Sequence, residues 1–136
     1  MNKIYSKIDS SKLILSFMKA EEITHKRIDM CPEEEYLQIS GRKFKKGIKV
    51  DAHKHLQVLR NSNITQEAWV VLEGSIKSKF YDLDNSLLFE LILNKGDVAI
   101  LFRGGHSLEV LEENTIFYEF KNGPYLGQEL DRTFIK

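Results

Sequence analysis

The chain has 136 residues and a formal net charge of zero, because its 20 basic and 20 acidic residues balance. No basic stripe stands out among these mixed charges, which argues against nucleic acid as a partner. The length predicts a single domain with a substantial core. The one cysteine, Cys31, excludes an internal disulfide and is typical of a protein of the reducing cytoplasm. The longest apolar run, residues 87–93, is too short to span a bilayer, so we expect no membrane partner.

The first 24 residues differ in pattern from the rest of the chain. Asp9, Ser10 and Ser11 are typical of a helix cap, and apolar residues follow at helical spacing, namely Leu13, Ile14, Phe17 and Met18. We therefore expect a short helix within an N-terminal covering segment, residues 1–24. Residues 25–136 would form the body of the domain.

From residue 36 onward the sequence alternates between strand-forming segments and turn residues. Turn residues recur at near-regular spacing, and between them we expect eight strands. This number of short strands predicts an all-β barrel or jelly roll. The expected strands are 36–44, 48–56, 65–72, 76–81, 87–93, 98–102, 106–111 and 116–121.

Three of the four histidines and one glutamate are placed so that they could surround a single metal ion. His53 and His55 form an H-x-H pair, and on a strand both imidazoles would point to the same face. Glu67 and His106, on neighbouring strands, could complete a shell of three imidazoles and one carboxylate. Such a donor set suits zinc or iron(II). The alternative is a hydrogen-bonded polar cluster that never binds metal.

Around these residues the sequence resembles the two motifs of the cupin superfamily. Residues 47–74 match the first motif, in which Gly-x5-His-x-His is followed by Glu and then, after six residues, by Gly. Residues 96–106 resemble the second motif, although Phe102 replaces the usual proline and His106 comes one residue early. The resemblance implies a single-domain cupin jelly-roll barrel, or double-stranded β-helix. It also implies one divalent metal (iron, manganese, zinc or nickel) bound by the four residues named above.

Three shorter segments resemble a narrower group of small cupins, those encoded among surface-polysaccharide and nucleotide-sugar genes. They are residues 64–71, 103–106 and 121–125. This resemblance implies a small-molecule substrate derived from a sugar.

Two further side chains are candidates for substrate chemistry. Glu119 would be a possible general base if it faced the barrel, because desolvation raises the pKa of a carboxyl group. The alternative is an exposed carboxylate beside Lys121. Arg103 precedes two glycines at the expected barrel mouth and could clamp an anionic group of the substrate. The alternative is a solvated turn arginine.

The strand that carries Glu67 also predicts a second apolar surface. If Glu67 points inward, the alternation of a strand directs Ala68, Val70 and Leu72 outward. Such a stripe requires cover, either by the N-terminal segment or by a second subunit, and we expect a homodimer.

Three functions are compatible with these residues. The first is a metal-dependent isomerase or epimerase of a sugar or nucleotide-sugar, in which the metal polarises a carbonyl and an inward acid or base moves the proton. The second is an iron-dependent dioxygenase of the same fold. The third is a non-catalytic module that binds or senses a ligand. We expect a cytoplasmic enzyme of the first kind.

Overall fold

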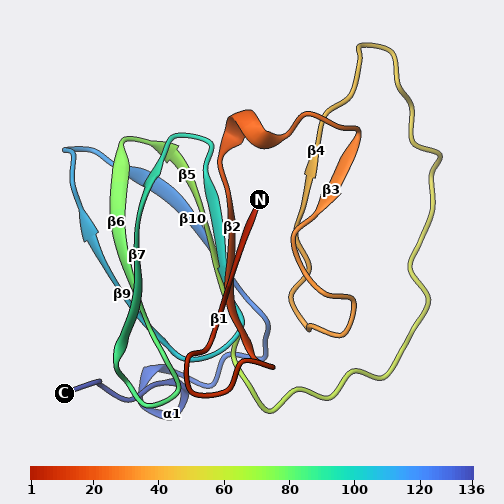
Figure 1. Cartoon of the computed structure of the whole chain (residues 1–136). Helices are drawn as coiled ribbons and strands as arrows, with labels where there is room; N and C mark the ends of the chain where they lie inside the picture. Colours follow the sequence, from red (N-terminus) through yellow and green to blue (C-terminus); the bar gives the residue numbers. More distant parts are fainter.

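The computed structural model describes residues 1–136 and consists mainly of antiparallel β-strands (Figure 1). Its two helical turns are short, and no helix has the length and apolar character needed to cross a membrane. In chain order the elements are β1 (Asn2–Tyr5), β2 (Leu13–Met18), η1 (Ala20–Glu22), β3 (Arg27–Asp29), β4 (Ser40–Arg42), β5 (Glu67–Glu73), β6 (Ser75–Tyr81), β7 (Leu87–Asn94), β8 (Val98–Leu101), β9 (Gly105–Val110), β10 (Ile116–Lys121) and α1 (Gln128–Asp131).

The strands form two main sheets that face each other and a separate small one. The five-stranded sheet has the order β1-β2-β8-β5-β10, the three-stranded sheet the order β7-β6-β9, and β3 pairs with β4 alone. All seven pairings are antiparallel. Because no pairing joins the two main sheets, the fold is an open sandwich. The expected all-β class is confirmed, and no closed barrel is formed.

Glycine turns carry the chain from one main sheet to the other. Gly74 joins β5 to β6 with a φ of +71°, and a Cβ there would lie 2.3 Å from Oγ1 of Thr115. Gly104 precedes β9 with a φ of +82°, and a Cβ there would lie 2.3 Å from the carbonyl oxygen of Tyr81. Only glycine adopts such a backbone conformation without steric cost. Both turns lie where the sequence predicts them.

The main core lies between the two sheets. Aromatic side chains dominate it: the ring centroids of Trp69 and Phe80 are 6.1 Å apart, and Phe17 stacks on Phe89 at 5.6 Å. Large aromatic rings bury the most apolar area per residue, and that area is the main favourable contribution to folding. The other buried members are Ile14, Leu15, Val71, Ile76, Leu93, Ala99 and Leu101.

A second core lies on the opposite face of the five-stranded sheet. Residues 20–42, which we call the cover, contain η1, β3 and β4 and pack onto Ala68, Val98 and Ile100 of that sheet. Met30 of the cover is completely buried there. The apolar stripe that begins at Ala68 is therefore covered by residues 20–42 of the same chain, which overlap the expected covering segment 1–24 only at residues 20–24. The homodimer stays a prediction.

The helix expected in the first 24 residues is wrong, because residues 13–18 form β2. All six residues of β2 are buried, since the strand lies between β1 and β8 and is covered on both faces. A strand buried on both faces is a continuous apolar run, which periodicity alone does not distinguish from a buried helix. The polar residues before it form a turn, in which the Ser11 amide donates to Oδ1 of Asp9 at 3.0 Å. Residues 1–18 thus belong to the sandwich and do not cover it.

Residues 43–66 connect the cover to β5 without a helix or a strand, and the middle of this segment projects away from the sheets (Figure 1). Every residue from 42 to 63 is exposed, and residues 49–61 make no backbone–backbone hydrogen bond. We call residues 48–59 the arm. The strand expected at 48–56 is therefore not formed, and of the strand expected at 36–44 only Ser40–Arg42 is present. A lone strand lacks the neighbours that stabilise it.

Candidate functional site

Four titratable side chains gather on the inner face of the sandwich. The β5–β10 register places Glu67 opposite Lys121 and Trp69 opposite Glu119, so all four residues share the face that Trp69 directs into the main core. β9 of the facing sheet contributes His106, whose ring lies 4.8 Å from that of Trp69, centroid to centroid. We call Glu67, His106, Glu119 and Lys121 the inner cluster.

Glu67 is the centre of the inner cluster. Nε2 of His106 lies 3.4 Å from its Oε2, and Nζ of Lys121 lies 3.1 Å from its Oε1. Lys121 also contacts Oε1 of Glu119 at 3.3 Å, and Nε1 of Trp69 donates to Oε2 of Glu119 at 3.4 Å. Glu67 is only 6% exposed, whereas the Glu119 side chain is 45% exposed. The cluster therefore runs from a buried carboxyl to a solvent-facing one.

The pKa values of the two carboxyl groups, Glu67 and Glu119, are shifted in opposite directions. Burial raises the pKa of Glu67 to about 7, and the hydrogen bond with Glu119 acts in the same direction against the opposing effect of Lys121. For Glu119, partial burial acts to raise the pKa, but hydrogen bonds with Glu67 and Lys121 outweigh it and hold the pKa below its ordinary value. Near neutral pH, Glu67 thus exchanges its proton while Glu119 stays ionised.

The two basic groups are shifted in opposite directions. Burial lowers the pKa of His106, and the positive charge of Lys121 lowers it further. Burial also acts to lower the pKa of Lys121, but its contacts with Glu67 and Glu119 raise it above the ordinary value. At pH 7 His106 is therefore neutral and Lys121 is charged. The contact between His106 and Glu67 is therefore not an ion pair at pH 7.

The four predicted metal ligands do not form one shell in this structure. Glu67 and His106 are neighbours, but His53 and His55 lie in the exposed arm (Figure 1). The two arm imidazoles are 5.5 Å apart, centroid to centroid, and Nδ1 of His53 lies 2.8 Å from the Asp51 carbonyl oxygen. No group of three or more His, Cys, Asp or Glu side chains is arranged to hold a metal ion. The residues do not fit the expected shell as they stand, and metal binding stays a prediction.

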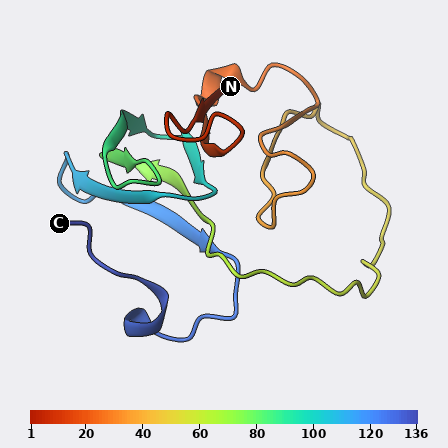
Figure 2. The same cartoon turned by 60° about the horizontal axis from the view of Figure 1, so that its bottom comes forward.

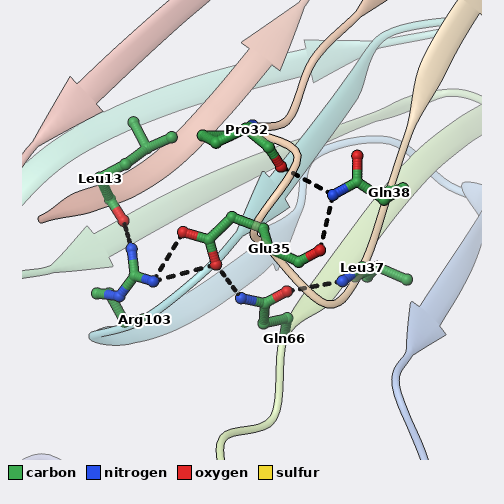
Figure 3. Close-up of polar contacts among 7 residues, drawn as sticks. All are labelled: Leu13, Pro32, Glu35, Leu37, Gln38, Gln66 and Arg103. Atoms are coloured by element: carbon green, nitrogen blue, oxygen red, sulfur yellow. Dashed lines mark hydrogen bonds and ion pairs between the residues drawn. The ribbon is translucent and has the colours of Figure 1, made fainter. Parts of the chain in front are cut away.

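Arg103, expected at a substrate mouth, makes a buried ion pair with the cover (Figure 3). Its Nη2 donates to both carboxylate oxygens of Glu35, at 2.8 and 3.1 Å, and its Nη1 donates to the Leu13 carbonyl. The Glu35 side chain is 8% exposed and that of Arg103 is 21% exposed. This arrangement fastens the cover to the end of β8, and the substrate-clamp role stays a prediction.

Gln66 extends the same network towards β5 (Figure 3). Its side chain is completely buried, donates to Glu35 and accepts the Leu37 amide at 2.8 Å. Gln38 also holds the loop in place, because its side-chain amide donates to the carbonyl oxygens of Pro32 and Glu35. Each buried polar group here has a partner, as stability requires.

Two surface hollows lie outside the inner cluster. One, of about 230 Å³, lies on the outer face of the three-stranded sheet and includes Lys77, Lys79 and Ser107. The other, of about 390 Å³, lies at the end of β10 and includes Tyr36 and Arg60. Neither hollow is lined by a member of the inner cluster.

Sequence reasoning identified most of the inner cluster but assigned its roles differently. Glu119 lies on the inner face, as its role as a base would require, but it is also 45% exposed beside Lys121, as the alternative describes. The raised pKa belongs to Glu67, which was expected to be a metal ligand. The bridging role of Lys121 was not foreseen. The alternation of β10 could have indicated it, because it places Lys121 and Glu119 on the same face.

Comparisons of the chain with protein-family models, with curated proteins and with solved structures found no match.

Proposed function

We propose that this protein is an enzyme that moves a proton on a small polar substrate, in the manner of an isomerase or epimerase. The observation that carries the proposal is the buried carboxyl of Glu67, whose pKa is raised to about 7. General acid–base catalysis is most efficient when the pKa of the catalytic group is near the working pH. Shifted groups of this kind are concentrated at functional sites.

The other members of the inner cluster support the proton transfer. The Lys121 ammonium, 3.1 Å from Oε1 of Glu67, stabilises the carboxylate when Glu67 has given up its proton. The same ammonium can donate to a substrate oxygen on which negative charge develops. Neutral His106 can act as a donor or an acceptor beside the reacting group.

The proposed substrate is a sugar or a nucleotide-sugar with a carbonyl group. The donors and acceptors of the inner cluster suit hydroxyl and carbonyl oxygens, and β9 adds the partly exposed apolar residues Leu108 and Val110 on the same inner face. Sugars combine polar hydroxyls with apolar C–H faces. The choice of a sugar rests on the sequence resemblance, and so does the finer proposal that the open sandwich is of the cupin jelly-roll type.

Hydrogen exchange from carbon tests the reaction. The purified protein is incubated in D₂O at pH 7 with a panel of aldoses, ketoses and nucleotide-linked keto sugars, and each is analysed by mass spectrometry for deuterium beside the carbonyl. We expect enzyme-dependent incorporation with at least one member of the panel. Glu67→Gln should reduce the rate at least ~100-fold, the usual scale of a positioned acid or base.

Glu109→Gln is the matched control, because Glu109 lies on β9 but on the opposite face from His106. It should retain the parental exchange rate. Equal exchange rates in the parent and in Glu67→Gln would refute the role of Glu67. Ligand binding without exchange in any member of the panel would instead establish a binding module, and oxygen consumption with bound iron would establish a dioxygenase.

The metal prediction is tested separately by elemental analysis of the purified protein. The prediction is about one equivalent of iron, manganese, zinc or nickel, lost in the His53→Ala/His106→Ala double variant. Full metal content in the double variant would exclude these two residues as ligands.

A further inference from the structure

The arm has the pattern of an amphipathic strand although it pairs with nothing. Its even-numbered positions are apolar except Lys54, and its odd-numbered positions from 49 to 57 are polar and include His53 and His55. The apolar residues are strongly exposed, with Val50 at 71%, Leu56 at 80% and Val58 at 60%. A strand with one apolar face and unpaired backbone groups is a template for pairing with another strand.

β10 offers a free edge with the same two-faced pattern. It is the last strand of the five-stranded sheet, so one of its edges has no neighbour, and five of its six residues are exposed. Tyr118 and Phe120 lie on its outer face, 58% and 47% exposed, with their ring centroids 6.0 Å apart. Glu119 and Lys121 lie on its inner face. A strand added here would extend both faces.

We propose that the arm of a second copy of this chain adds to the free edge of β10 as an antiparallel strand, and that the exchange is reciprocal. Two arms then pair with two β10 strands across one two-fold axis, which gives a closed dimer. The apolar side of the arm extends the surface of Tyr118 and Phe120. The polar side places His53 and His55 of the second copy on the face that carries Glu119 and Lys121.

The tether between the arm and β5 indicates a second copy and not the chain's own arm. The side chain of Asn122, directly after β10, donates to Oγ of Ser62 at 3.3 Å and to the Ile64 carbonyl at 3.0 Å. Figure 2 shows the end of the blue strand β10 beside this part of the chain. Only residues 60 and 61 separate the arm from that anchor.

A chain's own arm would therefore have to leave the anchor at the Lys121 end of β10 and run back along the strand, parallel to it. All seven strand pairings of this molecule are antiparallel. Parallel pairing is also slightly less stable for each residue. The arm of a second copy has no such restriction and can pair in the antiparallel direction.

One antiparallel register gives a favourable charge pair on the polar faces. The arm carries Lys49 and Asp51 on its histidine side, and β10 carries Glu119 and Lys121 on its inner side. Opposite charges on neighbouring strands favour pairing, whereas like charges oppose it. The antiparallel register that sets Asp51 opposite Lys121 also sets His53 opposite Glu119 and brings the arm histidines towards the inner cluster. A shift that set Lys49 opposite Lys121 and Asp51 opposite Glu119 would pair like charges and is disfavoured.

The test measures mass and backbone protection as a function of protein concentration. Light scattering after size exclusion should give twice the chain mass of 15.8 kDa at high concentration. Hydrogen–deuterium exchange should show protection of the arm and of β10 that rises with the dimer fraction. Protection that is independent of concentration in a monomer would mean that the chain's own arm docks. An arm unprotected at every concentration would mean that no docking occurs, and either result would overturn the proposal.

Two substitutions on opposite faces of the arm sharpen the test. Leu56→Asp puts a charge on the apolar face, opposite Ile116 in this register, and should weaken the dimer at least ~10-fold, because inward-facing charges block edge-to-edge pairing. Gln57→Asp puts the same charge on the polar face and should change the dimer dissociation constant less than ~3-fold. Equal effects of the two substitutions would contradict the proposed face. Since the arm is exposed in the isolated chain, neither substitution disturbs its core.

This inference extends the proposed acid–base site by adding the arm histidines, but its dimer stands apart from that function. A dimer without deuterium exchange from any substrate would leave the inference intact and refute the proposed function. Deuterium exchange by a strictly monomeric protein would refute the inference and leave the proposed function intact.

Discussion

The covered and the open end of the sandwich differ sharply. At the covered end, β2 and β8 have every residue buried, with the main core on one face and the cover on the other. At the open end, β9 and β10 each have five of six residues exposed. The first region supplies the buried apolar area that stabilises the fold. The second carries the inner cluster, so the chemistry lies where the core is least complete.

The two regions also differ in how they hold a buried carboxyl group, Glu35 in the covered region and Glu67 in the open one. Glu35 faces a guanidinium that donates two hydrogen bonds to it, and the surrounding amides complete the network. Glu67 faces one ammonium, a neutral imidazole and a second carboxyl group, and its pKa rises to about 7. The ion pair of Glu35 with Arg103 is a structural contact that holds the cover against the sheet. Burial, with the contact to Glu119 in addition, raises the pKa of Glu67, so its carboxyl group exchanges a proton near neutral pH.

The largest expected effect is a cavity in the covered region. Ile100→Ala empties space between the sheet and the cover at a completely buried position, and should lower the free energy of unfolding by about 4 kcal/mol. Leu108→Ala in the open region, where the side chain is 38% exposed, should lower it by only about 1 kcal/mol. Urea denaturation measures both. Similar losses would show that the open end is as well packed as the covered end.

Breaking the ion pair between Arg103 and Glu35 should have the next largest effect. Arg103→Met leaves Glu35 without its guanidinium and should destabilise the fold by about 3 kcal/mol. The Glu35→Gln/Arg103→Met double variant should recover part of that loss, because no unpaired charge remains. Arg42→Met, at an exposed arginine, is the control and should change stability by less than ~0.5 kcal/mol. A loss in the double variant equal to the summed losses of Arg103→Met and of Glu35→Gln alone would exclude coupling between the two side chains.

The pH dependence of stability should identify Glu67. Its pKa rises from 4.5 in the unfolded chain to about 7 in the folded one, so between these values the folded state binds more protons. Stability therefore falls as the pH rises through this window, by about 1–3 kcal/mol, and Glu67→Gln should remove that loss. His106 acts in the opposite direction, since its lowered pKa makes stability fall as the pH drops below about 6.5.

The difference between the parent and Glu67→Gln isolates the Glu67 contribution from that of His106. Denaturation at half-unit intervals from pH 4.5 to 8 gives this difference. A constant difference across the window would show that Glu67 titrates normally.

The smallest expected effect lies on the outer face of the three-stranded sheet. Nζ of Lys77 lies 3.1 Å from Oε2 of Glu90, and both side chains are about a third exposed or more. Lys77→Met should change the free energy of unfolding by less than ~0.5 kcal/mol, because an exposed ion pair gains little over its hydrated partners. A loss above 1 kcal/mol in thermal denaturation would show that this surface supports the sandwich.

Most of the strands could be predicted from local patterns, and the exceptions have a common cause. The six strands from β5 to β10 lie at the predicted positions within two residues, because turn residues and alternation are properties of neighbouring positions. β2 was mistaken for a helix because burial on both faces removes alternation. The arm is the opposite case: its clear alternation predicts a strand, but no strand forms because it has no neighbouring strand to pair with.

The sequence by itself determined the all-β class, the turns at Gly74 and Gly104, and that Glu67 and Trp69 share one face of their strand, because each depends on local backbone preference and the two-residue period of a strand. Only the tertiary structure decided that Lys121 and His106 meet at Glu67, that Glu67 and not Glu119 has the raised pKa, and that Arg103 pairs with Glu35. These outcomes depend on burial and on distances between residues remote in the chain. Local pattern contains neither quantity, because solvent exclusion arises only when whole sheets pack together.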